Sequence, residues 1–161
     1  MVIASRKNGP DMMESMQTFA FRHMLNLWPC YRGTGGRVTF IASDWRQATV
    51  RLKLGLRTRN YVGTIFGGSL YGAIDPIYML MLIKILGPAY MVWDKAATIR
   101  FKKPGRGILE AQFLITEEEI AMIRDLASQA RSIDRVYPVE FKDRDGQIVA
   151  QIEKTIYVRR K

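Results

Sequence analysis

The longest apolar run of the chain, residues 66–86, restricts its fold more than any other segment. Apolar residues recur on every face of a helix drawn through it, and the main interruptions are Asp75 and Lys84. A helix that is apolar all round is normally buried inside a fold. Gly87 and Pro88 come next, as glycine and proline commonly do after the end of a helix. The sequence therefore predicts a central helix over residues 66–86, roughly 30 Å long.

Such a run is also long enough to cross a lipid bilayer. Asp75, near its middle, argues against a membrane span because a carboxylate is costly in lipid. A carboxylate is costly in a soluble core as well, unless it is paired or has a function. Asp75 and Pro76 could instead begin a helix, with aspartate as the N-cap residue and proline at the first helical position.

The composition is that of one soluble domain, residues 1–161, with residues 1–10 as a loose lead-in. Hydrophobic residues make up 48% of the chain and charged residues 25%, as in ordinary soluble proteins. The N-terminus lacks the basic-then-apolar pattern of a secretory signal, and the single cysteine, Cys30, cannot form an internal disulfide. A cytoplasmic location is therefore expected.

The chain carries 25 basic and 15 acidic residues, a net charge of +10. This excess favours anionic partners, which include nucleic acid, an anionic membrane surface and phosphorylated small molecules. A nucleic-acid-binding function is disfavoured because no helix-turn-helix or ribonucleoprotein motif accompanies the charge. The single histidine, His23, argues against a histidine-rich metal site, and we expect no bound metal.

The segments around the central helix predict two more helices and six strands. A helix over residues 11–28, ended by Pro29, is indicated by apolar residues at helical spacing. These residues are Met13, Met16, Ala20, Met24 and Leu27. Thr116 and Glu119 form a capping-box pattern that begins a helix over residues 117–129. Alternating patterns indicate strands at residues 38–43, 47–54, 92–103, 108–115, 133–142 and 147–158.

The strands occur as three successive pairs that read as hairpins, and no regular βαβ alternation is present. The turn at residues 143–146, Asp-Arg-Asp-Gly, is a strong hairpin signal. The last strand places Ile148, Ala150, Ile152, Ile156 and Val158 on one face. The sequence therefore predicts an α+β domain with a mainly antiparallel sheet of about six strands wrapped around the long central helix. An apolar helix clasped by such a sheet is the hotdog fold.

One stretch makes a family resemblance specific. It holds an asparagine, a Gly-Thr pair, a Gly-Gly pair and an aspartate at fixed spacing, which are Asn60, Gly63, Thr64, Gly67, Gly68 and Asp75. This pattern resembles that of hotdog-fold acyl-CoA thioesterases of the phenylacetate-degradation type. The strand sequence I-R-F-K-K-P at residues 99–104 is similar to that family's strand after the helix. The sequence match is confined to residues 60–104. The predicted helix at residues 117–129 and the absence of the family's histidines indicate an uncharacterised bacterial branch.

Two departures from the family pattern concern histidines. The family usually places a histidine just before the Gly-Gly pair, where this chain has Phe66, and often another before the first glycine, where it has Val62. Two polar groups near a reacting thioester are therefore missing. Both departures affect the expected catalytic site and leave the expected fold unchanged.

The resemblance implies a role for each residue of the pattern. Asp75 would be the base that activates water, or the nucleophile itself, and the backbone N–H of Gly67 would polarise the thioester carbonyl. Asn60 would orient water or the thioester, with help from Thr64. In this family the site lies between subunits, so a homodimer or a dimer of dimers is expected, and Asp75 would serve a glycine loop of the other subunit. No cofactor is expected, since coenzyme A enters only as part of the substrate.

The resemblance also implies a substrate-binding surface around the site. Gly63, Phe66 and Gly68 would contact the substrate in the glycine loop. The phosphates of coenzyme A would lie near Lys102, Lys103 and Arg106, although these residues could equally form a solvated basic surface.

Three functions remain open from the sequence. An acyl-CoA thioesterase is the first, and a non-catalytic acyl-CoA or fatty-acyl binding protein on the same fold is the alternative that the missing histidines favour. A nucleic-acid-binding protein is supported by the charge alone. Insertion into a membrane is not expected in any of them. The chain length or ring preference of the acyl group, and the choice between coenzyme A and a carrier protein, are not encoded in any recognisable motif.

Overall fold

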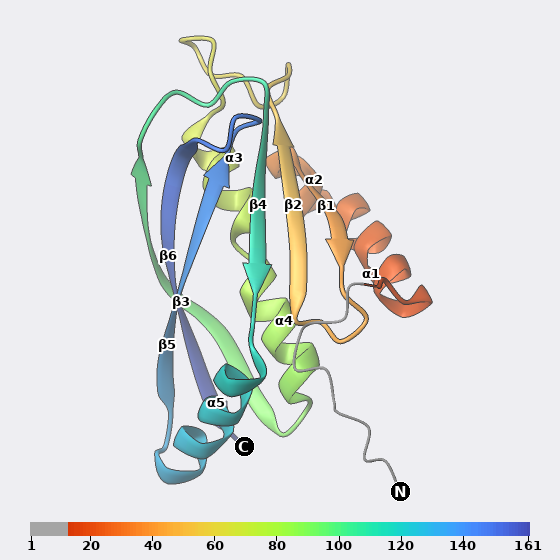
Figure 1. The fold of residues 1–161 in the computed structure, drawn as a ribbon, viewed down its shortest axis with the longest axis vertical. Coiled ribbons are helices and arrows are strands. Elements are labelled where there is room, and N and C mark those ends of the chain that lie inside the picture. The colour runs from red at the N-terminus through yellow and green to blue at the C-terminus, as the bar shows by residue number, and fades with distance from the viewer. Residues whose placement is uncertain (1–12) are drawn as a thin grey trace, which may run out of the picture.

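The computed structural model describes residues 13–161, so the predicted lead-in at residues 1–10 lies outside the described residues. A six-stranded sheet curves around a central helical segment, with further helices at its margins (Figure 1). The helices are α1 (Met16–Leu27), α2 (Pro29–Thr34), α3 (Gly67–Ile74), α4 (Ile77–Leu86) and α5 (Glu117–Gln129). The strands are β1 (Gly36–Ile41), β2 (Gln47–Lys53), β3 (Tyr90–Phe101), β4 (Ile108–Leu114), β5 (Ile133–Lys142) and β6 (Ile148–Arg160).

Neighbouring strands are antiparallel throughout, in the order β1-β2-β4-β5-β6-β3. The predicted α+β hotdog fold is therefore confirmed. The predicted hairpin between the third and fourth strands is wrong. β4 pairs with β2 on one side and β5 on the other, so β3 crosses to the far edge and pairs with β6. Alternation of apolar residues shows which face of a strand is buried, but it does not show which strand pairs beside it.

The predicted central helix is present as two consecutive segments, α3 and α4, which meet at Asp75 and Pro76. Pro76 has no N–H to donate to the preceding turn, which interrupts the helical hydrogen bonds at this point. Asp75 makes no side-chain cap, so its predicted alternative role as an N-cap is wrong. Side chains of both segments pack under the sheet, and Leu70, Ile74 and Leu82 are almost completely buried. Burial of each such side chain contributes about 2 kcal/mol to folding.

Gly67–Leu86 is the one helical stretch of the described residues that is long and apolar enough to cross a membrane. Length and composition alone are weak support for a membrane span, because the core helix of a soluble protein passes the same test. Half of this stretch is buried by the rest of the chain, and it occupies the centre of the fold (Figure 1).

Helix α1 confirms the predicted first helix from Met16 onward, whereas residues 13–15 are not helical and residues 11 and 12 lie outside the described residues. The helix is oriented with its most apolar face outward. The stripe that revealed the helix in the sequence lies on the solvent side, where Met16 is 83% exposed and Leu27 is 69% exposed. Phe21 and Leu25, on the opposite face, pack against the core instead. The short helix α2 was not predicted, because Pro29 was read only as the end of α1. It is also the first residue of α2, a position that suits proline.

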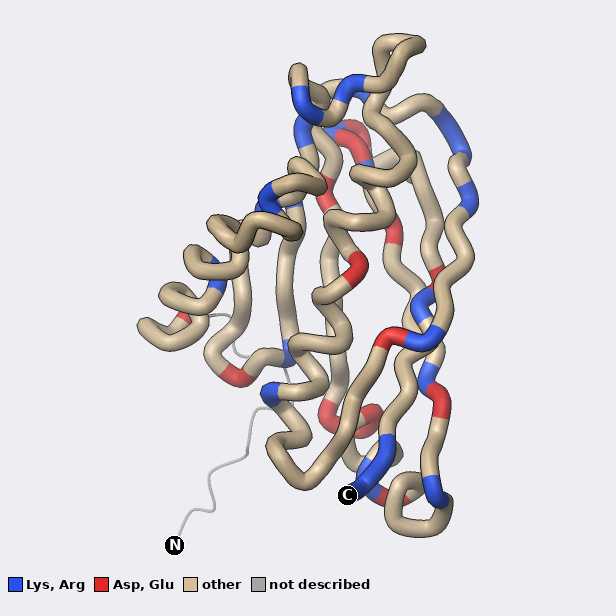
Figure 2. The backbone as a smooth tube through the Cα atoms, turned by 180° about the vertical axis from the view of Figure 1, so that it is seen from behind, with Lys and Arg blue, Asp and Glu red and all other residues tan. Residues whose placement is uncertain are grey.

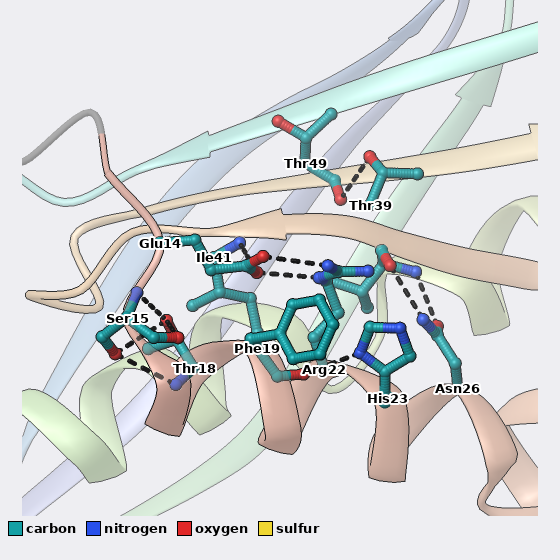
Figure 3. Close-up of polar contacts among 11 residues, drawn as sticks. Glu14, Ser15, Thr18, Phe19, Arg22, His23, Asn26, Thr39, Ile41 and Thr49 are labelled. Atoms are coloured by element: carbon teal, nitrogen blue, oxygen red, sulfur yellow. Dashed lines mark hydrogen bonds and ion pairs between the residues drawn. The ribbon is translucent and has the colours of Figure 1, made fainter.

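Polar contacts hold α1 along the free edge of β1 (Figure 3). The side-chain amide of Asn26 donates to the carbonyl of Val38 and accepts from its N–H, both at 2.8 Å, much as a neighbouring strand would. Glu14 accepts two hydrogen bonds from Arg22, at 2.7 and 2.9 Å, and a longer one from the N–H of Ile41. One edge of the sheet is therefore covered by the chain itself.

Candidate functional site

The predicted site begins in a loop just before α3, and this loop is closed by Asn60 and Thr64. The side-chain oxygen of Asn60 accepts from the N–H of Thr64 and its amide nitrogen donates to the Thr64 hydroxyl, each at 2.9 Å. The N–H of Asn60 also donates to the carbonyl of Thr64 at 2.8 Å. Gly63 has a φ of 80° at the tip, a conformation that favours glycine. The structure thus brings three predicted residues together, and the amide of Asn60 is engaged within the loop.

The glycine pair that follows forms the first turn of α3. Residues at this position have no acceptor within the helix. Within residues 13–161 we find no partner for the N–H groups of Gly67 and Gly68 either. Phenyl rings flank the pair: a Cβ atom on Gly67 would lie 2.9 Å from the ring of Phe101, and one on Gly68 would lie 2.3 Å from the ring of Phe66. The result is a pair of free N–H donors at a helix N-terminus with apolar walls.

The loop between β3 and β4 lies beside the loop that Asn60 and Thr64 close. The N–H of Ile65 donates to the carbonyl of Gly105 at 2.9 Å. This contact places the predicted phosphate-binding residues near the site. Lys102 and Arg106 are exposed, with no ion pair to any described residue. Lys103 is different: its Nζ atom lies 2.5 Å from a carboxylate oxygen of Asp143 and also binds the side chain of Gln147. The Lys103 side chain therefore binds the turn between β5 and β6.

Asp75 is paired with a buried lysine. Its Oδ1 atom accepts a hydrogen bond of 2.6 Å from Nζ of Lys154, which lies on β6. The side chain of Lys154 is only 1% exposed, whereas that of Asp75 is 40% exposed. A buried ammonium group needs a counter-charge, and Asp75 supplies one while one side of its carboxylate remains open.

A second carboxylate, Asp94 on β3, completes what we call the Lys154 cluster. Its Oδ1 atom lies 2.8 Å from Lys154 Nζ as an ion pair without hydrogen-bond geometry, and the Tyr71 hydroxyl lies 3.4 Å from the same nitrogen. Burial raises the pKa of Asp94, although Lys154 opposes this shift. Burial acts to lower the pKa of Lys154, but its two carboxylate partners outweigh that effect and the pKa is raised.

Sequence analysis did not identify Lys154 or Asp94 as site residues, although Lys154 left a signal. It falls on the face of the last strand that also carries Ile152 and Ile156, so the alternation directs it inward. A lysine on the apolar face of a strand must find an anionic partner. The sequence contains no comparable signal for Asp94, because β3 has a bulge between Asp94 and Ala96 that only the sheet reveals.

Asp75 and the free N–H of Gly67 lie on the same helical segment, eight residues apart. At the helical rise per residue, this spacing corresponds to roughly 12 Å. A thioester held at Gly67 would therefore be out of reach of the Asp75 of the same chain. A site that combines both groups requires a second copy.

The edge strand β3 offers a place for that copy. It lies at the opposite edge of the sheet from β1 and α1, and it pairs on one side only, with β6. Most of its residues are exposed, including Trp93 at 60% and Phe101 at 56%. Open edge strands readily pair with another chain. Across residues 13–161, no group of three or more histidine, cysteine, aspartate or glutamate side chains could hold a metal ion.

Several solved structures share this fold. Protein PA5026 of Pseudomonas aeruginosa, of unknown function and also named "Probable Thioesterase", has a TM-score of 0.80 and 17% identity over 95% of this chain and 100% of its own. Protein OLEI01261 of Chlorobaculum tepidum, of unknown function, has a TM-score of 0.70 and 13% identity, with 89% and 94% covered. Thioesterase HI1161 of Haemophilus influenzae has a TM-score of 0.67 and 12% identity, with 94% of each chain covered.

At these low identities the likeness shows the fold. No curated protein matches the chain in sequence. A family model described as "Domain of unknown function (DUF4442)" matches residues 17–158, which is nearly all of the described chain. The chain therefore belongs to the DUF4442 family, on a hotdog fold.

Proposed function

We propose that the protein is a thioesterase that hydrolyses an acyl-CoA thioester, as its resemblance to the hotdog-fold acyl-CoA thioesterases implies. The observation that carries the proposal is the combination, on one central helix, of free N–H groups at Gly67 and Gly68 with a carboxylate at Asp75 held by a buried lysine. Thioester hydrolysis needs donors for the developing oxyanion and a base or nucleophile. PA5026, named a probable thioesterase, and the thioesterase HI1161 agree with this class of reaction.

In the proposed reaction the carbonyl oxygen of the thioester accepts hydrogen bonds from the first turn of α3. The Asp75 of a second subunit takes a proton from a water molecule, whose oxygen attacks the carbonyl carbon. The tetrahedral intermediate places its negative charge on the oxygen facing Gly67, where the helix N-terminus stabilises it. Collapse breaks the carbon–sulfur bond, the coenzyme A thiolate leaves and takes the proton that Asp75 accepted, and the carboxylic acid is released.

Asp75 could also act as the nucleophile. Its oxygen would then form an anhydride with the acyl group, release the thiolate and be regenerated by water. A single turnover in water enriched in oxygen-18 distinguishes the two routes. The label enters only the product if Asp75 is the base. If Asp75 is the nucleophile and water attacks its own carbonyl carbon in the anhydride, the label enters the Asp75 carboxylate, so label found there establishes the nucleophilic route.

Lys154 is a positioning residue in this proposal. Its ammonium group holds one oxygen of Asp75 at 2.6 Å, while the Asp75 side chain stays 40% exposed and open to a substrate. Asp94 balances the remaining charge of the lysine from β3. The same strand would form the proposed homodimer contact, so the cluster would lie next to the subunit boundary.

The direct test is steady-state release of free thiol from a panel of short, long and aromatic acyl-CoAs. Hydrolysis of at least one member, with Michaelis–Menten saturation, is the expected result. Absence of hydrolysis above background on the whole panel, at high protein concentration, would contradict the proposal.

A non-catalytic acyl-CoA binding protein is the second candidate. Two observations favour it: Phe66 stands where the family usually has a histidine, and the Asn60 amide is bonded within its own loop. This candidate predicts saturable binding of acyl-CoA by calorimetry together with no thiol release. The same protein sample therefore decides between the two.

A further inference from the structure

The outward face of α1 is an exposed apolar surface that the proposed catalytic function does not explain. Its residues recur at helical spacing and form a stripe free of charged side chains, which we call the α1 stripe: Met16, Ala20, Met24 and Leu27. Trp28 extends it beyond the helix end and is 55% exposed. Soluble proteins rarely leave such a face uncovered unless it binds something.

The inward face of α1 shows why this orientation is fixed. Asn26 and Glu14 bond to the edge of β1, and Thr18 is completely buried with its hydroxyl bonded to Ser15 (Figure 3). Rotation of the helix to bury the stripe would break these bonds and expose Phe21. The stripe is therefore held outward by the fold and is not a misplaced core face.

A basic groove adjoins the stripe at the C-terminal end of α1. Its volume is about 700 Å³, and Leu27 belongs to both the stripe and the groove. Four cationic side chains line it and no carboxylate does: Arg32, Arg37, Lys53 and Arg57. All four are exposed, and none forms an ion pair with a residue of the described range. Figure 2 shows basic segments gathered at this end of the molecule.

We propose that the α1 stripe and the basic groove together dock the protein on an anionic lipid bilayer. An apolar helical face bordered by cations is the arrangement with which helices lie in the membrane interface without crossing it. The apolar side chains would enter the boundary between headgroups and acyl chains, and the cations would meet the phosphates. Trp28 suits the same depth, since tryptophan favours the membrane–water interface.

A second copy of the chain fits this surface less well. A symmetric contact between two such faces would bring the groove cations of both copies together, with no carboxylate in the groove to offset them. The sheet edge proposed for dimer formation, β3, is the edge opposite to β1 and α1. Docking on a membrane would therefore leave that edge available.

Cosedimentation with vesicles tests the proposal. We expect the full-length protein to bind vesicles of phosphatidylglycerol and phosphatidylcholine in equal parts, to bind pure phosphatidylcholine far more weakly, and to dissociate as salt rises. The double variant Met16→Glu, Met24→Glu should bind at least tenfold more weakly. Its matched control is Leu114→Glu, Met122→Glu, which adds the same charge at exposed apolar positions on other elements and should bind normally.

The cations are tested by a second pair of variants. Removal of one cation near an anionic surface weakens binding about fivefold. The affinity for anionic vesicles should therefore fall on the order of a hundredfold in the triple variant Arg32→Ala, Arg37→Ala, Arg57→Ala. The control Arg124→Ala, Arg131→Ala, Arg144→Ala removes the same charge from exposed, unpaired positions elsewhere among the described residues. Thermal unfolding should be unchanged in all four variants, since every substituted side chain is exposed.

Three results would overturn the proposal. The first is no binding to either kind of vesicle. The second is equal loss of binding in a variant and its matched control, which would indicate a general effect of net charge. The third is normal vesicle binding by the Met16→Glu, Met24→Glu variant with a smaller mass in sedimentation, which would assign the stripe to a contact between copies.

Discussion

At the scale of single residues, the chemistry depends on how one buried charge is balanced. Lys154 is 1% exposed and lies between Asp75 and Asp94. A fully buried lysine that lost both partners would cost several kcal/mol, so the fold requires this cluster whether or not it is catalytic. Mutations must therefore separate a structural requirement from a catalytic one.

Asp75→Asn is the first such mutation. The amide keeps the shape and can still bond to its neighbours, but it can neither accept a proton from water nor attack as a carboxylate. We expect kcat to fall about a hundredfold or more, with little change in the affinity for a non-hydrolysable acyl-CoA. The matched control is Asp125→Asn on the exposed side of α5, which should hydrolyse acyl-CoA normally. An Asp75→Asn variant as fast as the parent enzyme would end the proposed mechanism.

Lys154→Met is the second mutation. It leaves two carboxylates without their cation, and we expect a loss of about 3 kcal/mol in the free energy of unfolding, measured in urea. Addition of Asp94→Asn should restore part of that loss, because it removes one unpaired charge. A positioning role also predicts that kcat falls at least tenfold while KM changes little. An unchanged kcat in a folded variant would leave Lys154 with a structural role alone.

At the scale of elements, α1 shows that a helix can be held by a few polar bonds while its most apolar face remains outside. Asn26 and Glu14 occupy the β1 edge where another strand would otherwise pair (Figure 3). This arrangement leaves β3 as the sheet edge open to another chain.

The attachment of α1 should depend on pH through Glu14. The hydrogen bonds from Arg22 hold the pKa of Glu14 below its ordinary value. A lowered folded-state pKa stabilises the fold above the unfolded-state value, about 4.3, and this contribution is lost as the pH falls through the folded-state value. We expect Glu14→Gln to cost about 1 kcal/mol at neutral pH and nothing at the acidic end. Urea unfolding of both proteins across that pH range measures this cost. A difference in the free energy of unfolding that does not change with pH would contradict the prediction.

The loop between β3 and β4 allows a test of coenzyme A binding. Lys102 and Arg106 are free to meet phosphates, whereas Lys103 is engaged with Asp143. We expect Lys102→Ala with Arg106→Ala to raise KM several-fold with a smaller effect on kcat, and more so at low salt. Lys103→Ala should change KM much less. If the three residues affect KM equally, or not at all, this surface does not bind the phosphates of coenzyme A.

At the scale of the whole molecule, the proposed site exists only in an assembly. Asp75 and Gly67 are too far apart within one chain, so the proposed activity requires a homodimer, or a dimer of dimers. We expect sedimentation to give a dimer at micromolar concentration. Ala97→Lys, on the exposed edge strand β3, should weaken it by bringing like charges together and should reduce activity in parallel.

Val136→Lys is the control for the assembly. It places the same charge at a residue of β5 that is 59% exposed and lies away from the β3 edge of the sheet. It should leave both the mass and the activity unchanged. A monomeric parent protein that hydrolyses acyl-CoA would disprove the shared site.

The sequence by itself determined the main elements and the fold class. The apolar run at residues 66–86, with Asp75 near its middle, favours a buried helix, and the alternating segments favour a sheet with one face against it. The spacing of Asn60, Gly67 and Asp75 indicated a candidate site through its resemblance to a known family, because such a pattern lies within a short stretch of the chain. These features depend on contacts within one element or on the period of its side chains.

Only the tertiary structure decided how the elements meet. The pairing of β3 with β6, the outward face of α1 and the cluster of Lys154 with Asp75 and Asp94 all join residues far apart in the chain. An apolar stripe has the same period whether it faces the core or the solvent. A lysine on an inward face of a strand needs an anionic partner, and the sequence shows this need. Which carboxylate pairs with the lysine depends on the packing of the whole sheet around its helix.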